Sequence, residues 1–139
     1  MSTSVFIYSF FGVELPDNWK FMYEDNIAEK YASAVHPNCR MSGSPPSYKD
    51  QQSAIENSGC ELVGLGNSDQ METFVAAQGS VTKETDACNS LKCTMSISGP
   101  QDLEQLNKWT DNLVDFCRAL QVPKDLIQPR WMTGWYISF

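Results

Sequence analysis

Few side chains in this chain have the types and spacing needed for catalysis. His36 is the only histidine among the 139 residues, and it stands directly before Pro37. A serine or cysteine nucleophile needs a base beside it, so either would have to use His36. The sequence contains no nucleophile elbow, no phosphate-binding loop and no paired-histidine zinc motif. We therefore expect a protein that is not an enzyme and has no cofactor.

The cysteines offer a metal site only as an alternative. His36 and Cys39 form one pair of zinc-type ligands, and Cys88 and Cys93 form another. The two pairs lie far apart in the sequence, and neither has the C-x2-C spacing typical of zinc sites. The N-terminal residues lack the basic region of a signal peptide, and five cysteines are an odd number. These features favour reduced thiols in a cytoplasmic protein, in the host cytoplasm if the protein is viral.

Acidic residues give the most informative pattern. Ten basic and seventeen acidic side chains produce a net charge of −7. Asp25 and Glu29 are four residues apart in one helical pattern, and Asp111 and Asp115 are four apart in another. Together with Glu24 they predict an acidic face on two helices. Such a face repels phosphate backbones and attracts basic proteins, which excludes direct binding of nucleic acid.

The leading hypothesis is a small acidic binding protein without enzymatic activity. We expect an inhibitor of the phage or mobile-element type that occupies the basic, nucleic-acid-binding surface of a partner protein. One alternative is a small-molecule or nucleotide binder with a pocket between segment 40–58 and an aromatic sheet. That pocket would use Arg40, Tyr48, Trp131 and Trp135. Another alternative is a structural subunit of a larger assembly, and the pattern leaves the partner and the oligomeric state open.

Hydrophobic periodicity predicts the elements that would position these residues. Strands are expected at 4–13, 60–65, 72–78, 91–98 and 130–139, and helices at 17–34 and 98–121. Strand 4–13 carries apolar side chains on both faces, which is typical of an interior strand. Residues 83–90 are expected to form a connection, and segment 37–59 to be long and irregular or mobile, with at most a short helix at 51–55.

The order β-α-βββ-α-β predicts the α+β class. We expect one antiparallel or mixed sheet of about five strands, with two amphipathic helices packed on one face, because each helix has one apolar stripe to bury. The length favours a single domain over 1–139. No apolar run approaches the ~18 residues that a membrane span requires, so no membrane contact is expected.

Overall fold

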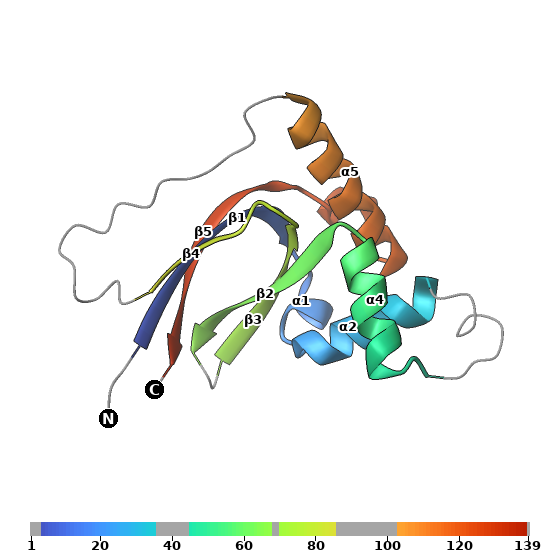
Figure 1. The fold of residues 1–139 in the computed structure, drawn as a ribbon, viewed down its shortest axis with the longest axis horizontal. Coiled ribbons are helices and arrows are strands. Elements are labelled where there is room, and N and C mark those ends of the chain that lie inside the picture. Colours follow the sequence, from blue (N-terminus) through green and yellow to red (C-terminus); the bar gives the residue numbers. More distant parts are fainter. Residues whose placement is uncertain (1–3, 36–44, 68–69, 86–102, 139) are drawn as a thin grey trace.

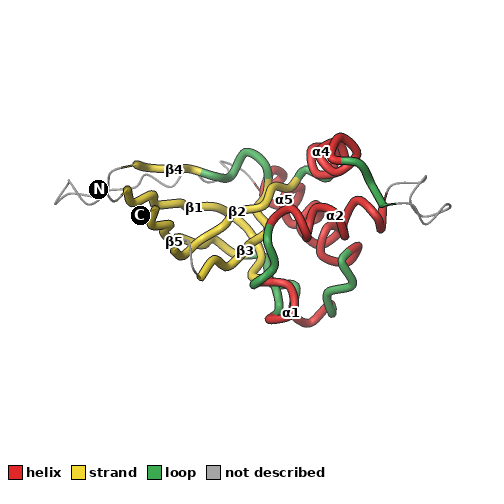
Figure 2. Tube along the Cα trace, turned by 90° about the horizontal axis from the view of Figure 1, so that it is seen from below, coloured by secondary structure: helices red, strands yellow, loops and turns green. Residues whose placement is uncertain are grey.

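A computed structural model describes residues 4–35, 45–67, 70–85 and 103–138. The strands are β1 (Ser4–Glu14), β2 (Cys60–Asn67), β3 (Gln70–Ala77), β4 (Thr82–Thr85) and β5 (Arg130–Ser138). The helices are α1 (Asp17–Lys20), α2 (Glu24–Val35), α4 (Tyr48–Asn57) and α5 (Leu103–Ala119), with a 3-10 helix at Lys124–Leu126. The helices gather at one end of the sheet (Figures 1 and 2). The predicted α+β class with one mixed five-stranded sheet is confirmed.

The sheet has the order β3-β2-β5-β1-β4 and bends back on itself. β1 pairs with β5 along its length and with β4 on its other side, so the predicted interior strand is confirmed. The last residues of β1 also pair with β3, which joins four strands in a closed series of pairings (Figure 1). All pairings are antiparallel except β2 with β5, which meet in parallel at Gly66 and Asn67 of β2.

Alternation along β1 divides the apolar residues between two cores. Phe10 points to one face of the sheet, where it packs with Val63 and Phe74. Phe11 points to the opposite face, where the core contains residues of α2 and α5. Successive side chains of a strand face opposite ways, so one apolar strand supplies both cores.

Helices α2 and α5 pack against the same face of the sheet and against each other. Ile27 and Tyr31 of α2 share one buried core with Leu113 and Phe116 of α5. The rings of Tyr31 and Phe116 stack with their centroids 4.1 Å apart and their planes 14° from parallel. The prediction of two amphipathic helices on one face is therefore confirmed.

The continuous helix predicted over 17–34 is wrong, because the chain breaks between α1 and α2. In a continuous helix the Met22 carbonyl would accept the N–H of Asn26, but Asn26 bonds to Tyr23 instead, at 3.0 Å. The hydroxyl of Thr73, a buried residue of β3, donates to the Met22 carbonyl at 2.9 Å. This tertiary hydrogen bond satisfies the carbonyl that the helix would otherwise use.

Segment 37–59 contains a helix longer than the sequence analysis allowed. α4 has ten residues and begins after a capping box, in which Ser47 and Asp50 bond to each other's backbone N–H groups. Ser47, the first residue of the capping box, directly follows Pro45 and Pro46. Few apolar residues stand around these two prolines, which is why the sequence favours an irregular segment there. The expectation of irregular structure is therefore wrong for the second half of the segment.

The remaining boundaries differ in detail. Residues 82–85 form the edge strand β4 rather than the start of a connection, and the predicted strand 91–98 lies outside the described residues. The C-terminal strand agrees with the prediction. α5 ends close to the predicted position, while residue 98, where this helix was predicted to begin, lies outside the described part. Within the described ranges, no helix has both the length and the apolar character needed to cross a membrane.

Candidate functional site

A groove of about 280 Å³ lies between α2 and α4. On the α2 side it is lined by Glu24, Asp25 and Ala28, and Leu62 of β2 also contributes. The α4 side is lined by Tyr48, Gln51, Gln52, Ile55 and Glu56. We call the feature formed by these nine residues the acidic groove.

The local sequence of α4 explains why its lining residues share one side. Residues three and four apart on a helix are neighbours, so Tyr48, Gln52 and Ile55 lie on one face. The Gln52 amide donates to the Tyr48 hydroxyl at 3.2 Å. The Ser47 hydroxyl accepts the N–H of Asp50 at 3.1 Å, which starts the helix at Tyr48. Tyr48 remains 69% exposed, so its ring is accessible to a partner.

A second cavity, of about 400 Å³, lies against the sheet and meets the acidic groove at Glu24 and Leu62. Tyr8 of β1 and Tyr136 of β5 line it, together with Glu61 of β2. Its other lining residues are Val63, Gly64, Met71 and Val81. We call this cavity the sheet chamber. Glu24 belongs to both cavities, so the two form one connected surface.

Both cavities are negatively charged. Their linings contain the carboxylates of Glu24, Asp25, Glu56 and Glu61, and among the described residues that line them there is no lysine or arginine. Glu24 and Glu61 are half-buried, and burial raises the pKa of both carboxyls; Asp25 raises the pKa of Glu24 further. A desolvated carboxylate without a cation is costly, so a bound cation would stabilise both groups.

Carboxylates near α1 are instead already paired. The Lys20 ammonium lies 3.5 Å from Glu14, 3.8 Å from Asp17 and 3.7 Å from Glu72. Arg130 donates to the other carboxylate oxygen of Glu14 at 3.0 Å. These ion pairs connect α1 with β1, β3 and β5, which is a structural role.

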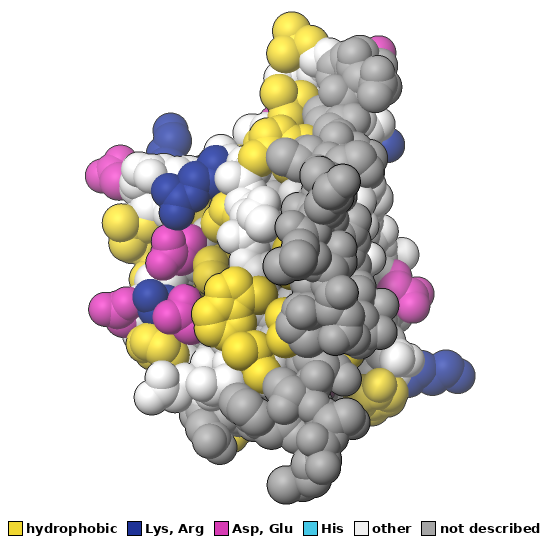
Figure 3. Space-filling view, turned by 90° about the vertical axis from the view of Figure 1, so that its left-hand side faces the viewer, with side chains coloured by type: hydrophobic (Ala, Val, Ile, Leu, Met, Phe, Trp, Pro, Cys, Tyr) yellow, Lys and Arg dark blue, Asp and Glu magenta, His cyan; other side chains and the backbone are white. Residues whose placement is uncertain are grey.

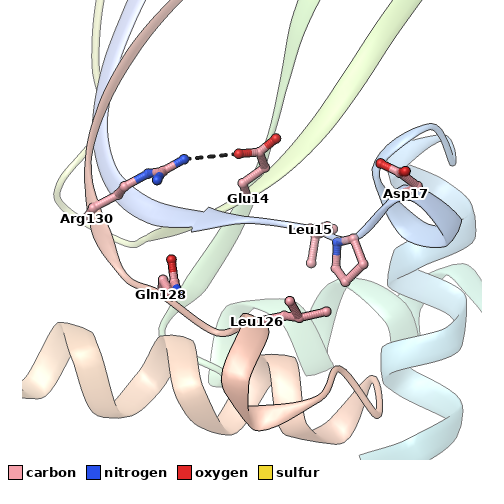
Figure 4. A pocket seen from close by; sticks show the side chains of 7 residues that line it. Glu14, Leu15, Asp17, Leu126, Gln128 and Arg130 are labelled. Atoms are coloured by element: carbon pink, nitrogen blue, oxygen red, sulfur yellow. Dashed lines mark hydrogen bonds and ion pairs between the residues drawn. The ribbon is translucent and has the colours of Figure 1, made fainter.

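A surface pocket of about 260 Å³ lies beside the Glu14–Arg130 pair and is also lined by Gln128 and Leu126 (Figure 4). The Glu14 and Arg130 side chains point at one another rather than outward to a ligand. On the left of the face shown in Figure 3, acidic side chains likewise lie next to lysine or arginine side chains. The molecule is therefore not uniformly acidic. Among the described residues, the acidic groove and the sheet chamber are distinguished by carboxylates that have no ion pair.

The structure brings together some residues of the predicted acidic face and separates others. Glu24 and Asp25 line the acidic groove, but Glu29 lines another cavity, between α2 and the end of α5. Asp111 and Asp115 are exposed on α5 and line none of these cavities. Of the five residues predicted to form one acidic face, two therefore line the acidic groove, one lines another cavity and two lie on open helix surface.

The predicted ligand pocket is also divided. Tyr48 lies in the acidic groove, whereas Trp131 packs in the core against Phe11 and Trp109. Trp135 is 52% exposed on β5 and does not line the cavity that contains Tyr48. The described tryptophans and Tyr48 therefore do not form the single pocket expected.

The other predicted ligands cannot be placed. Arg40 lies outside the described residues. The same is true of the four alternative zinc ligands, His36, Cys39, Cys88 and Cys93. Within the described ranges, no group of three or more histidine, cysteine, aspartate or glutamate side chains could hold a metal ion.

Glu61 and the two chamber tyrosines were missed by the sequence analysis. Glu61 stands within the apolar run of β2, between Cys60 and Leu62. A carboxylate inside an otherwise apolar strand is the available signal, because such a group meets either solvent or a cavity. No protein-family model matches this chain, and the searches of curated proteins and of solved structures also found no match.

Proposed function

We propose that this protein is a non-enzymatic binding protein whose acidic groove holds a basic segment of a partner protein. The observation that carries the proposal is the lining of the groove. The carboxylates of Glu24, Asp25 and Glu56 line it together with apolar side chains, and no basic residue is among the described lining residues. Lysine and arginine have apolar stems and charged ends, so they match such a lining in both respects.

The partner that fits best is a protein that itself binds nucleic acid. Such proteins display lysine and arginine side chains that neutralise phosphates, and these side chains are complementary to the groove. The net charge of −7 speeds the approach of a basic partner by long-range attraction. In its finer form, the proposal is an inhibitor of the phage or mobile-element type that covers the partner's nucleic-acid site in the cytoplasm.

Nucleotide binding is the less favoured function. A nucleotide phosphate placed in the acidic groove or the sheet chamber would meet carboxylates, and the described lining residues supply no cation to balance it. Arg130, which lines the pocket beside Glu14, is already paired with that carboxylate.

A charge-matched pair of variants tests the proposal. Asp25→Asn combined with Glu56→Gln removes two charges from the acidic groove, and Asp111→Asn combined with Glu104→Gln removes two from exposed positions on α5. The probe is a fluorescein-labelled peptide of alternating lysine and arginine, and the readout is fluorescence anisotropy. We expect the groove variant to weaken binding about fivefold or more and the α5 variant about twofold or less. Equal losses in both variants would contradict the proposal.

A further inference from the structure

Two half-buried carboxylates approach the sheet chamber from different elements, Glu24 from α2 and Glu61 from β2. Neither has a hydrogen bond or an ion pair with any other described residue. Lys83 of β4 lies 4.5 Å from the Phe6 ring centroid and 5.7 Å from that of Tyr8, and it forms no ion pair within the described part. Within the described part of the chain, the negative charge of the chamber therefore has no balancing cation.

The chamber also has aromatic sides. The rings of Tyr8 and Tyr136 line it, and Tyr136 is held in place by stacking on Phe6 at a centroid distance of 6.0 Å. A cation near an aromatic face is attracted by the ring's quadrupole. The position of Lys83 over two rings shows that aromatic faces of this sheet accept a cation.

We propose that the sheet chamber is an anchor slot for one arginine side chain of the basic segment, an inference that rests on the proposed function of the acidic groove. Because Glu24 and Leu62 line both cavities, a segment lying in the groove can extend one side chain into the chamber. A volume of about 400 Å³ is sufficient for one such side chain.

Arginine fits the chamber better than lysine for two physical reasons. Its planar guanidinium has five N–H donors and can bond to two carboxylates while lying against a tyrosine ring. It is also more weakly hydrated than the lysine ammonium, so less hydration is lost when it enters a half-buried site. We therefore expect the protein to bind an arginine ligand more tightly than a lysine ligand of equal charge.

The test compares two fluorescein-labelled peptides of nine residues, all arginine or all lysine, by anisotropy. We expect the wild-type protein to bind the arginine peptide about two- to fivefold more tightly. Glu61→Gln and Tyr136→Leu should abolish this preference, while Asp111→Asn, which changes the charge as Glu61→Gln does, should leave it intact. A wild-type protein without preference, or a preference that survives Glu61→Gln, would overturn the slot.

The outcomes separate the slot from the groove. If the Asp25→Asn, Glu56→Gln variant weakens both peptides but wild type shows no preference, the acidic groove stands and the slot is wrong. If that variant binds like its α5 control, the proposed function is wrong. If a chamber variant fails to fold, the slot is tested instead by titrating the wild-type protein with methylguanidinium and following its amide chemical shifts. Amide shifts centred on Gly64 support the slot, and shifts elsewhere alone contradict it.

Discussion

The Glu24 carboxylate lies over Gly64 of β2, so that a Cβ atom at Gly64 would come within 3.1 Å of Glu24 Oε1. The same atom would overlap the terminal methyl of Met71. Gly64→Ala should therefore displace both side chains in the sheet chamber. We expect weaker binding of the arginine peptide but a change in unfolding free energy of about 1 kcal/mol or less, because the end of a methionine side chain moves easily. Unchanged peptide affinity would contradict this placement of Glu24.

The same substitution at Gly12 should have a different effect. A Cβ atom there would overlap the backbone carbonyl of Val75, the residue before Ala76, which is the partner of Gly12 in the β1–β3 pairing. Backbone in a paired strand cannot move without disturbing the sheet, so Gly12→Ala should cost about 2–3 kcal/mol of stability. Urea unfolding of both alanine variants measures the contrast, and equal losses would show that the close approach at Gly12 is wrong.

The break between α1 and α2 predicts a second stability contrast. Thr73→Val removes the buried hydroxyl that donates to the Met22 carbonyl, and this part-buried carbonyl then lacks its partner. We expect a loss of about 1–3 kcal/mol in urea unfolding. Thr110→Val is the matched control, because Thr110 bonds to the Leu106 carbonyl within its own helix, at 2.9 Å. A similar loss in the two variants would refute the role of Thr73.

Stability and binding should respond to pH in opposite directions. Burial raises the pKa of Glu24 and Glu61 above the ordinary 4.5, so the folded protein holds protons that the unfolded chain releases. The stability contributed by these groups is therefore lost as the pH rises from about 4.5 through the raised pKa values. Affinity for the arginine peptide should rise over the same window, because the ligand needs ionised carboxylates.

A variant with Glu24→Gln and Glu61→Gln provides the comparison. Other groups that face the pair, Asp25 and the tyrosines Tyr8 and Tyr136, remain in both proteins. In urea unfolding, the free energy of unfolding of the variant should increase relative to that of the wild type as the pH rises. The affinity of the variant for the arginine peptide should vary less with pH than that of the wild type. Parallel pH profiles of the two proteins would show that these carboxyls are not the cause of the pH dependence of stability and affinity.

The two described cysteines should be unreactive in the folded protein. Burial raises the pKa of Cys60 and of Cys117 to about 12, and Cys60 Sγ donates to the Asn112 carbonyl at 3.4 Å. Because the thiolate is the reactive form, iodoacetamide at mildly alkaline pH should modify them only as the protein unfolds. Mass spectrometry of the two cysteine peptides, before and after addition of urea, measures this. Rapid modification of either thiol in the native protein is the contrary result.

Local patterns in the sequence were sufficient for much of the fold. The double-sided apolar alternation of β1 identified it as an interior strand, and the apolar stripe of α5 identified the face that it buries. These signals work because the side-chain periods of strands and helices are properties of the backbone itself. The break at Met22 could not be foreseen in this way, because its cause is Thr73, a residue of another element.

The candidate site shows the same division. Helical spacing placed Glu24 and Asp25 on α2, but nothing local indicated that Glu61, Tyr8 and Tyr136 would line the same cavity as Glu24. Their meeting depends on which strands pair and on how the sheet bends, and these depend on contacts between distant parts of the chain. Periodicity specifies the face on which a residue lies, whereas the packing of the elements specifies what that face meets and how much water remains there.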